Sequence, residues 1–143
     1  MAITQLSAFL ANRPGTLAQA VTAISDAGVN LRALSVADTS DFGVLRVIVS
    51  DVKKTKEALS EYTIASETPV IAVKMTDEAG SLKQILDILQ KADINVEYVY
   101  AFTSAALGGA YVVMRVDDIA QAEDVLNAHD KVTLSDADLE GFL

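Results

Sequence analysis

Residues 12–31 read NRPGTLAQAVTAISDAGVNL, and residues 77–96 read DEAGSLKQILDILQKADINV. The two stretches align without a gap at an offset of 65 residues, and their landmark residues coincide. The landmark pairs are Gly15 with Gly80, Leu17 with Leu82, Ala27 with Ala92 and Asn30 with Asn95. Two later pairs, Gly43 with Gly109 and Asp51 with Asp117, coincide at an offset of 66. One structural unit therefore occurs twice along the chain.

The spacing of the apolar residues changes in the same order in both copies, and this order predicts the secondary structure. Each copy begins with a strand and an amphipathic helix, returns to two strands, and ends with a shorter helix and a last strand. Strands are predicted at residues 3–10, 30–37, 44–50 and 62–66, and again at 70–75, 95–102, 110–116 and 132–135. Helices are predicted at residues 17–27, 52–59, 82–92 and 119–127, with a polar tail over 136–143. Each copy is therefore βαββαβ.

This order predicts an α+β protein made of two ferredoxin-like units, residues 1–67 and 68–143. Right-handed crossovers place both helices of a unit on one face of a four-stranded antiparallel sheet and leave the other face bare. The strand at 44–50 is nevertheless apolar on both faces, so we expect a further surface to cover the bare face. A unit of about 65 residues is also marginal in size. We therefore expect a homodimer.

The composition excludes most catalytic chemistry. The 143 residues contain no Cys and one His, His129, which excludes disulfides and thiolate sites and leaves little for a metal site or a triad. The pair Gly108-Gly109 precedes no Lys-Ser or Lys-Thr, so it is interpreted as a strand connection and not a phosphate loop. We can name no nucleophile, general base or cofactor site, and we expect a non-enzyme with no cofactor and no metal; an enzyme that works through paired carboxylates alone is the weakest alternative left open.

The net charge is −9, which has the wrong sign for binding nucleic acid. Residues 1–66 carry six basic and six acidic side chains, whereas residues 67–143 carry five basic and 14 acidic ones. This acidic excess either solvates the second unit or docks a basic partner. No apolar stretch is long enough to span a membrane, and the first residues do not resemble a secretory signal. We expect a cytoplasmic protein.

At its two repeated loops the chain resembles the ACT domain, a small-molecule regulatory module of amino-acid metabolism, and as a whole it is similar to standalone tandem ACT-domain proteins. The resemblance covers about residues 3–135. It implies a non-catalytic, allosteric regulatory protein that binds a free amino acid at interfaces between modules, with the Gly loop on one side and the strand-start Asn often supplied by the neighbouring module. The candidate ligand-binding residues are Asn12, Arg13, Pro14, Gly15, Thr16, Leu17, Asn30, Leu31, Asp77, Glu78, Ala79, Gly80, Ser81, Leu82, Asn95 and Val96.

Elementary chemistry agrees with this implication. A helix N-terminus offers unpaired N–H groups and the positive end of a dipole to an α-carboxylate, and a glycine there permits close approach. An Asn amide can hold either the carboxylate or the ammonium group. The family loop commonly has an acidic residue followed by Pro-Gly. The first loop has Asn12 in the acidic place, and the second keeps Asp77 but has Ala79 in place of Pro.

The two loops also differ in charge. Arg13 adds a positive charge to the first loop, whereas Asp77 and Glu78 should oppose a carboxylate at the second. We therefore favour the first loop. A mixed site, in which Asp77 or Glu78 receives the ammonium group, stays open. So does the alternative that these residues are ordinary turn and helix-start residues.

Three other features have structural interpretations. Tyr98, Tyr100 and Phe102 alternate along one strand and are interpreted as packing between modules or chains, because base stacking would need a basic surround. Asp117-Asp118 is interpreted as a helix cap and His129 as a solvated residue. The alternative function is that of a subunit that docks on a metabolic enzyme without binding a small ligand.

Overall fold

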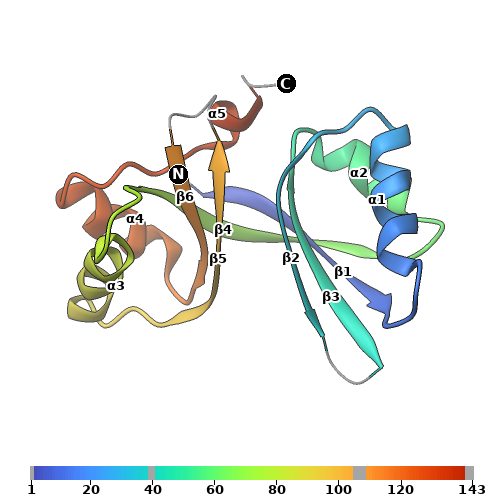
Figure 1. The fold of residues 1–143 in the computed structure, drawn as a ribbon. Helices are drawn as coiled ribbons and strands as arrows, with labels where there is room; N and C mark the ends of the chain where they lie inside the picture. Colours follow the sequence, from blue (N-terminus) through green and yellow to red (C-terminus); the bar gives the residue numbers. More distant parts are fainter. Residues whose placement is uncertain (1, 39–40, 105–108, 141–143) are drawn as a thin grey trace. The chain divides into compact units, whose positions relative to one another are not determined.

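The computed structural model describes residues 2–38, 41–104 and 109–140, and over these residues the chain forms six strands and five helices (Figure 1). In chain order the elements are β1 (Ile3–Ala11), α1 (Thr16–Asp26), β2 (Leu31–Asp38), β3 (Phe42–Val49), α2 (Val52–Leu59), β4 (Ala65–Met75), α3 (Ser81–Lys91), β5 (Val96–Ser104), β6 (Gly109–Val116), α4 (Ile119–Ala128) and α5 (Asp136–Glu140). The predicted α+β class and the βαββα order of each copy are confirmed. Gly108 and residues 141–143 lie outside the described part of the chain.

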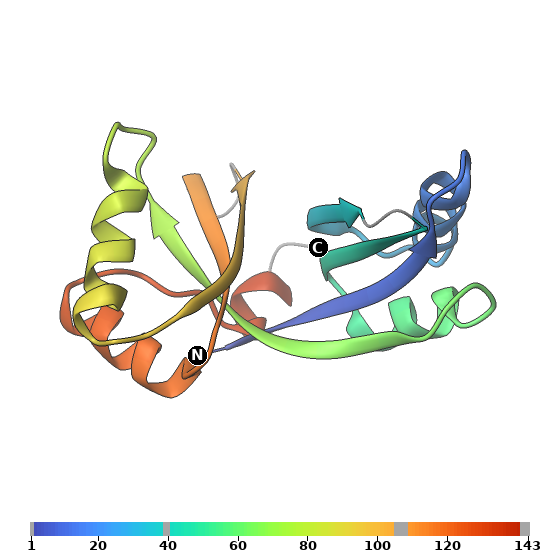
Figure 2. The same cartoon turned by 90° about the horizontal axis from the view of Figure 1, so that it is seen from below.

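The chain divides into two compact units with a boundary between Thr68 and Pro69. The N-terminal unit comprises Thr4–Thr68, and the C-terminal unit comprises residues 69–140 together with residues 2–3. In each unit two helices lie side by side on one face of the sheet, α1 with α2 and α3 with α4, as both views show (Figures 1 and 2).

In the N-terminal unit, β3 lies between β2 and β1 and pairs antiparallel with both. Alternate residues of β1 and β3, such as Ala8 and its partner Leu45, are buried beneath the helices together with Ile24 of α1 and Leu59 of α2. These positions follow the period of two in the strands and the period of 3.6 in the helices, so the core forms where the sequence places its apolar residues.

The C-terminal unit repeats this plan with different side chains. Here β6 lies between β5 and β4, and Met114 of β6 is opposite Ile71 of β4. Both are fully buried in a core that also holds Leu89 of α3 and Leu126 of α4. The same layer of sheet and paired helices is thus built twice by one sequence pattern.

The prediction of two separate four-stranded sheets is wrong. The strand order is β2-β3-β1-β4-β6-β5 in one six-stranded sheet, because β4 runs without a break from Ala65 to Met75. The strand predicted at 62–66 and the strand predicted at 70–75 are therefore one strand. Pro69 does not interrupt it, because the fixed φ of proline is compatible with an extended chain at a position that donates no ladder hydrogen bond.

The end of the chain also differs from the prediction. The strand predicted at 132–135 is reduced to a single bridge between Val73 and Thr133, in which Lys74 N donates to Val132 O at 2.8 Å and Leu134 N donates to Ala72 O at 2.9 Å. The predicted polar tail contains the short helix α5, whose Leu139 is only 3% exposed. One apolar residue among acidic ones thus suffices to anchor this helix.

The helix caps correct the alignment of the two copies that was made from the sequence. Asp51 caps α2 and Asp118 caps α4, and each accepts a hydrogen bond from the backbone N–H three residues later. The equivalent of Asp51 is therefore Asp118 and not Asp117, so the offset late in the unit is 67 and not 66. Asp38 pairs with Gly43 and Thr103 pairs with Ala110, so both extra residues of the second copy lie between Thr103 and Ala110.

Candidate functional site

The helix that opens each unit starts at a glycine in the left-handed conformation. Gly15 has φ 88° and Gly80 has φ 90°, and each is the N-cap of its helix, α1 or α3. No side chain hydrogen-bonds to the first turn of either helix at its cap. A Cβ at either glycine would meet no atom within 4 Å, so the space beside the loop is open. The backbone requires glycine here because L-residues with side chains rarely adopt this φ.

The second helix of each unit provides an internal comparison. The Asp51 side chain accepts a hydrogen bond from Lys54 N, and the Asp118 side chain accepts one from Gln121 N, both at 3.0 Å. The Asp side chains thus cap the N-termini of α2 and α4, whereas α1 and α3 have no side-chain cap, and of their first N–H groups Thr16 N donates to Arg13 O at 3.3 Å and Ser81 N donates to Glu78 O at 3.2 Å. Those two termini are the ones available to an anion.

The residue that follows each glycine fixes its loop. Thr16 Oγ1 donates to Ala11 O at 2.6 Å or to Arg13 O at 2.9 Å. Ser81 Oγ accepts from Thr76 N at 3.0 Å and lies 3.2 Å from Thr76 Oγ1. The two hydroxyl groups, both predicted as ligand contacts, therefore hold the loops in shape.

The first loop borders an open cleft of about 670 Å³. The cleft is lined by Arg13, Pro14, Gly15 and Thr16 and by Ala18, Gln19 and Thr22 of α1. Arg13 is the charged residue among them, so the cleft combines a cationic side chain with the positive end of the α1 dipole. An anionic group of small size suits this arrangement.

In the second unit two of the predicted residues line separate clefts. Asp77 lines a cleft of about 700 Å³ with Met75, Phe102 and the facing ends of β5 and β6. Asn95 lines another, of about 560 Å³, with Asp93 and Asp117. Both carry carboxylates, so these clefts favour a cationic group.

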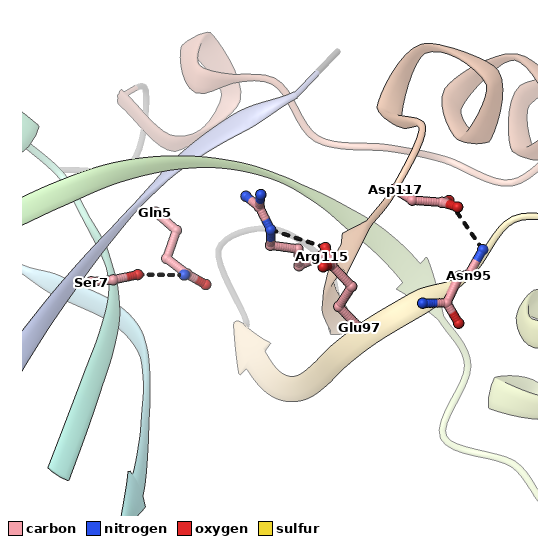
Figure 3. Close-up of polar contacts among 6 residues, drawn as sticks. All are labelled: Gln5, Ser7, Asn95, Glu97, Arg115 and Asp117. Atoms are coloured by element: carbon pink, nitrogen blue, oxygen red, sulfur yellow. Dashed lines mark hydrogen bonds and ion pairs between the residues drawn. The ribbon is translucent and has the colours of Figure 1, made fainter. Parts of the chain in front are cut away.

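The two strand-start asparagines are held by their backbones. Asn30 N donates to Ser50 Oγ at 3.0 Å, and Asn30 O accepts from Ser50 N at 3.0 Å. Asn95 N donates to the Asp117 carboxylate at 3.1 Å, and Asn95 O accepts from Asp117 N at 3.2 Å (Figure 3). The Asn95 side chain points away from this carboxylate in Figure 3. Both residues are exposed, so each presents its amide to solvent on a fixed backbone.

Within one unit the glycine loop and the asparagine do not come together. Gly15 precedes α1 and Asn30 follows it, and a helix of 11 residues is about 16 Å long. Gly80 and Asn95 are separated in the same way by α3. The functional groups of one amino acid are only a few ångströms apart, so a single unit supplies half of the predicted site at each end of its helix.

Three residues with other predicted roles can be located in the structure. Asp118 is a helix cap, as predicted, while Asp117 holds the Asn95 backbone. His129 is exposed, with Nδ1 2.8 Å from Val125 O. Among the described residues no group of three or more His, Asp or Glu side chains could hold a metal ion. Nor does that part of the chain contain a helix long and apolar enough to cross a membrane.

The Phe102 ring of the aromatic stripe stacks on Tyr111 of the neighbouring strand, with centroids 5.5 Å apart, which is a contact within the second unit; packing of the stripe between modules or chains stays a prediction. Tyr111 itself was missed by the sequence reasoning. It is 3% exposed, and its pKa is raised from the ordinary value by burial and, secondly, by the Asp138 carboxylate. A partly buried Arg32 on β2 was also missed, because a single arginine in a strand is unremarkable in sequence.

These features define a class of protein, a pair of βαββα modules in which the opening helix of each module starts at a glycine without a side-chain cap. The chain belongs to the ACT domain pair family, whose model matches residues 1–142. The predicted resemblance is thereby confirmed. A search of curated protein sequences found no match.

Solved structures share the fold. The protein BT0572 from Bacteroides thetaiotaomicron is 32% identical, with a TM-score of 0.89 over 98% of this chain and 96% of that one. The ligand-free regulatory subunit of aspartate kinase from Thermus thermophilus is 16% identical, with a TM-score of 0.65 over 89% of this chain and 90% of that one. The corresponding subunit from Thermus flavus is 17% identical, with a TM-score of 0.61 over 91% and 93%.

Proposed function

We propose that this protein is a non-catalytic regulator that binds a free amino acid at an interface between ACT modules, as a homodimer. The observation that carries the proposal is the duplicated pair of half-sites, an uncapped glycine helix start and an exposed asparagine on a fixed backbone. Membership of the ACT domain pair family supports it. So does the likeness in fold to regulatory subunits of aspartate kinase.

The chemistry assigns each group of the ligand a place. The α-carboxylate accepts hydrogen bonds from the first-turn N–H groups of α1, close to Arg13. The α-ammonium group donates to the amide oxygen of an asparagine that belongs to another module, because the asparagine of the same unit lies at the far end of the helix. A site that needs two modules is complete only when they are correctly placed.

This requirement gives the regulatory mechanism. A ligand that bridges two modules stabilises the arrangement in which both half-sites meet, and it shifts the population toward that state. A partner enzyme that recognises one arrangement is then bound more or less tightly, and the two binding events are coupled by the same free energy in both directions. No residue of the chain has to take part in bond making or breaking.

The test is a thermal-shift screen of the full chain against the twenty amino acids. A ligand at about 100 times its dissociation constant adds about 2.7 kcal/mol of stability, which raises the melting temperature by several degrees. We expect one amino acid or a few related ones to act. A flat screen with a folded protein contradicts the proposal.

Two variants then locate the site. Asn30→Ala should weaken binding by about 1–3 kcal/mol, the value of one or two hydrogen bonds, and Asn95→Ala is its matched control in the second unit. Gly15→Val should abolish binding, and circular dichroism checks that the variant folds. Unchanged affinity in Gly15→Val and Asn30→Ala moves the site to Gly80 and Asn95.

One observation favours the alternative, a subunit that docks on a metabolic enzyme without a small ligand. Phe9 is 67% exposed and Phe42 is 54% exposed. Their partners in the sheet are Val44 and Ala11, and the neighbouring pair Ala8 and Leu45 is buried under the helices, so both rings lie on the opposite face. Copurification with Phe9→Ser as the variant separates the two functions, since loss of a partner without any amino-acid effect favours docking alone.

A further inference from the structure

The two units differ at one charged position near the start of their second strand. In β2 the register shifts between Leu31, which pairs with Val49, and Ala33, which pairs with Ile48, so Arg32 is the extra residue of a β-bulge. In β5 the register shifts in the same way between Val96 and Tyr98, and the extra residue is Glu97. The two bulges are equivalent at the offset of 65 that relates the copies.

In the C-terminal unit the bulge residue has a counter-ion. Arg115, on the neighbouring strand β6 opposite Tyr98, donates from Nε to the Glu97 carboxylate at 3.1 Å (Figure 3). The bulge therefore aims its side chain at the position beside it on the next strand. In the N-terminal unit that position, opposite Ala33, is Ile48, which is fully buried and cannot pair with a charge.

The Arg32 guanidinium group thus has no counter-ion at the bulge in the described part of the chain. Its Nε and Nη2 are buried and make no hydrogen bond with any residue that the structure describes. Buried polar atoms nearly always have a partner, and a buried unpaired charge is costly, so these two nitrogens indicate a group that joins them. They are also the two donors of one edge of the guanidinium, the edge that holds both oxygens of a carboxylate in parallel hydrogen bonds.

The position of Arg32 connects it with the candidate ligand site. It is two residues beyond Asn30, which spans at most about 7 Å along an extended chain. Arg32 as a whole is only partly buried, so rotation about its side-chain bonds can bring the carboxylate-binding edge to the surface. The first 66 residues carry equal numbers of acidic and basic side chains, so the net charge of −9 does not fall on this half of the chain.

We infer that the free amino acid bound at Asn30 has an acidic side chain, and that Arg32 holds its side-chain carboxylate. This inference rests on the proposed function and names the class of its ligand. With the α-carboxylate on the α1 terminus of one module and the α-ammonium group at Asn30 of another, Arg32 is the cation left for a second carboxylate. An uncharged side chain of equal size leaves the guanidinium unpaired.

The test is isothermal titration of the full chain with L-aspartate and L-glutamate, and with L-asparagine and L-glutamine as isosteres that lack only the charge. We expect one acid to bind at least about tenfold more tightly than its amide, because a charge-assisted bidentate pair replaces a neutral contact. Arg32→Gln should abolish this preference, and Arg32→Lys should keep part of it. Arg115→Gln is the matched control, because its loss leaves Arg32 unchanged.

A second measurement needs no ligand. If Arg32 is unpaired in the free protein, Arg32→Gln unfolds at the same urea concentration as the wild type or at a higher one, whereas a structural ion pair at Arg32 would lower that midpoint. The lower midpoint overturns the inference. Tight binding of a neutral amino acid without preference for the acids overturns it also and leaves the proposed function intact. If none of the twenty amino acids binds, both are wrong.

Discussion

The Phe102 ring stacks on the Tyr111 ring, with centroids 5.5 Å apart and planes inclined by 19°. The two residues are direct partners on β5 and β6, so the contact is a cross-strand aromatic pair. It lies on the face of the sheet away from α3 and α4, because the next pair, Ala101 with Val112, places Val112 in the helix-covered core. The second unit therefore packs this face with aromatic rings, where the first unit exposes Phe9 and Phe42.

The buried Tyr111 predicts a pH dependence of stability. Burial and the Asp138 carboxylate raise the pKa of Tyr111 above 10.0, its ordinary value, so the neutral phenol is favoured in the folded state. This contribution is fully present below the unfolded pKa of about 10 and is lost as the pH rises through the higher folded pKa. Urea unfolding at pH 8 to 11 should show stability falling at the alkaline end more steeply than in Tyr111→Phe. Equal slopes in the two proteins would contradict the prediction.

The helix caps predict a matched pair of stability losses. Asp51→Ala and Asp118→Ala each remove the side chain that accepts a first-turn hydrogen bond, at 3.0 Å in both units, and each should cost about 1 kcal/mol of unfolding free energy. Asn at either position can still accept this bond, so Asp51→Asn should cost only a few tenths of a kcal/mol. Chemical denaturation measures all three. A similar loss in Asp51→Asn and Asp51→Ala would show that charge and not capping is responsible.

The glycine starts predict a different signature. Gly15→Ala and Gly80→Ala force a side chain into the left-handed region, where it meets no neighbouring atom, so the cost is backbone strain of about 1 kcal/mol each. Because a Cβ at Gly15 has open space around it, Gly15→Asn should be tolerated better than Gly15→Ala, since Asn adopts this conformation more readily. Urea midpoints in the order wild type, Asn, Ala are expected. The reverse order of the two variants would point to a steric contact instead of strain.

The duplicated pattern made the elements and the helix starts predictable. Gly15 and Gly80 were read as helix starts because they recur at one spacing, and both are N-caps in the structure. The continuity of β4 could not be predicted, because residues 66–69 look like a linker in the sequence. Only the pairing of β4 with the strands on either side shows that these residues belong to one strand. Strand pairing of this kind cannot be predicted from the local amino-acid composition.

The site was predictable in part for a similar reason. The loops and asparagines stand out by recurrence, whereas Arg32 stands out only when the bulge register and the buried Ile48 beside it are known. A bulge adds one residue to one strand, and only the pairing with the neighbouring strand identifies that residue as Arg32. The glycine loops and asparagines could thus be predicted from the sequence, whereas the unpaired guanidinium group of Arg32 could be identified only from the structure.

The short helix α5 predicts a local contribution to stability. Leu139 is 3% exposed, and α5 starts with Asp138 Oδ2 accepting hydrogen bonds from Ser135 N at 2.7 Å and from Ser135 Oγ at 3.0 Å. Leu139→Ala removes a buried side chain and should cost about 2 kcal/mol, at the lower end of the usual range because the end of the chain can adjust. Ala137→Ser, at an exposed position of the same helix, is the control and should cost a few tenths of a kcal/mol. The same variant should also change the titration of Tyr111. Because the Asp138 carboxylate raises the pKa of Tyr111, detachment of α5 in Leu139→Ala should lower that pKa, which absorbance titration of the tyrosines measures. A stability loss without this shift would mean that Leu139 anchors the chain end while Asp138 stays in place.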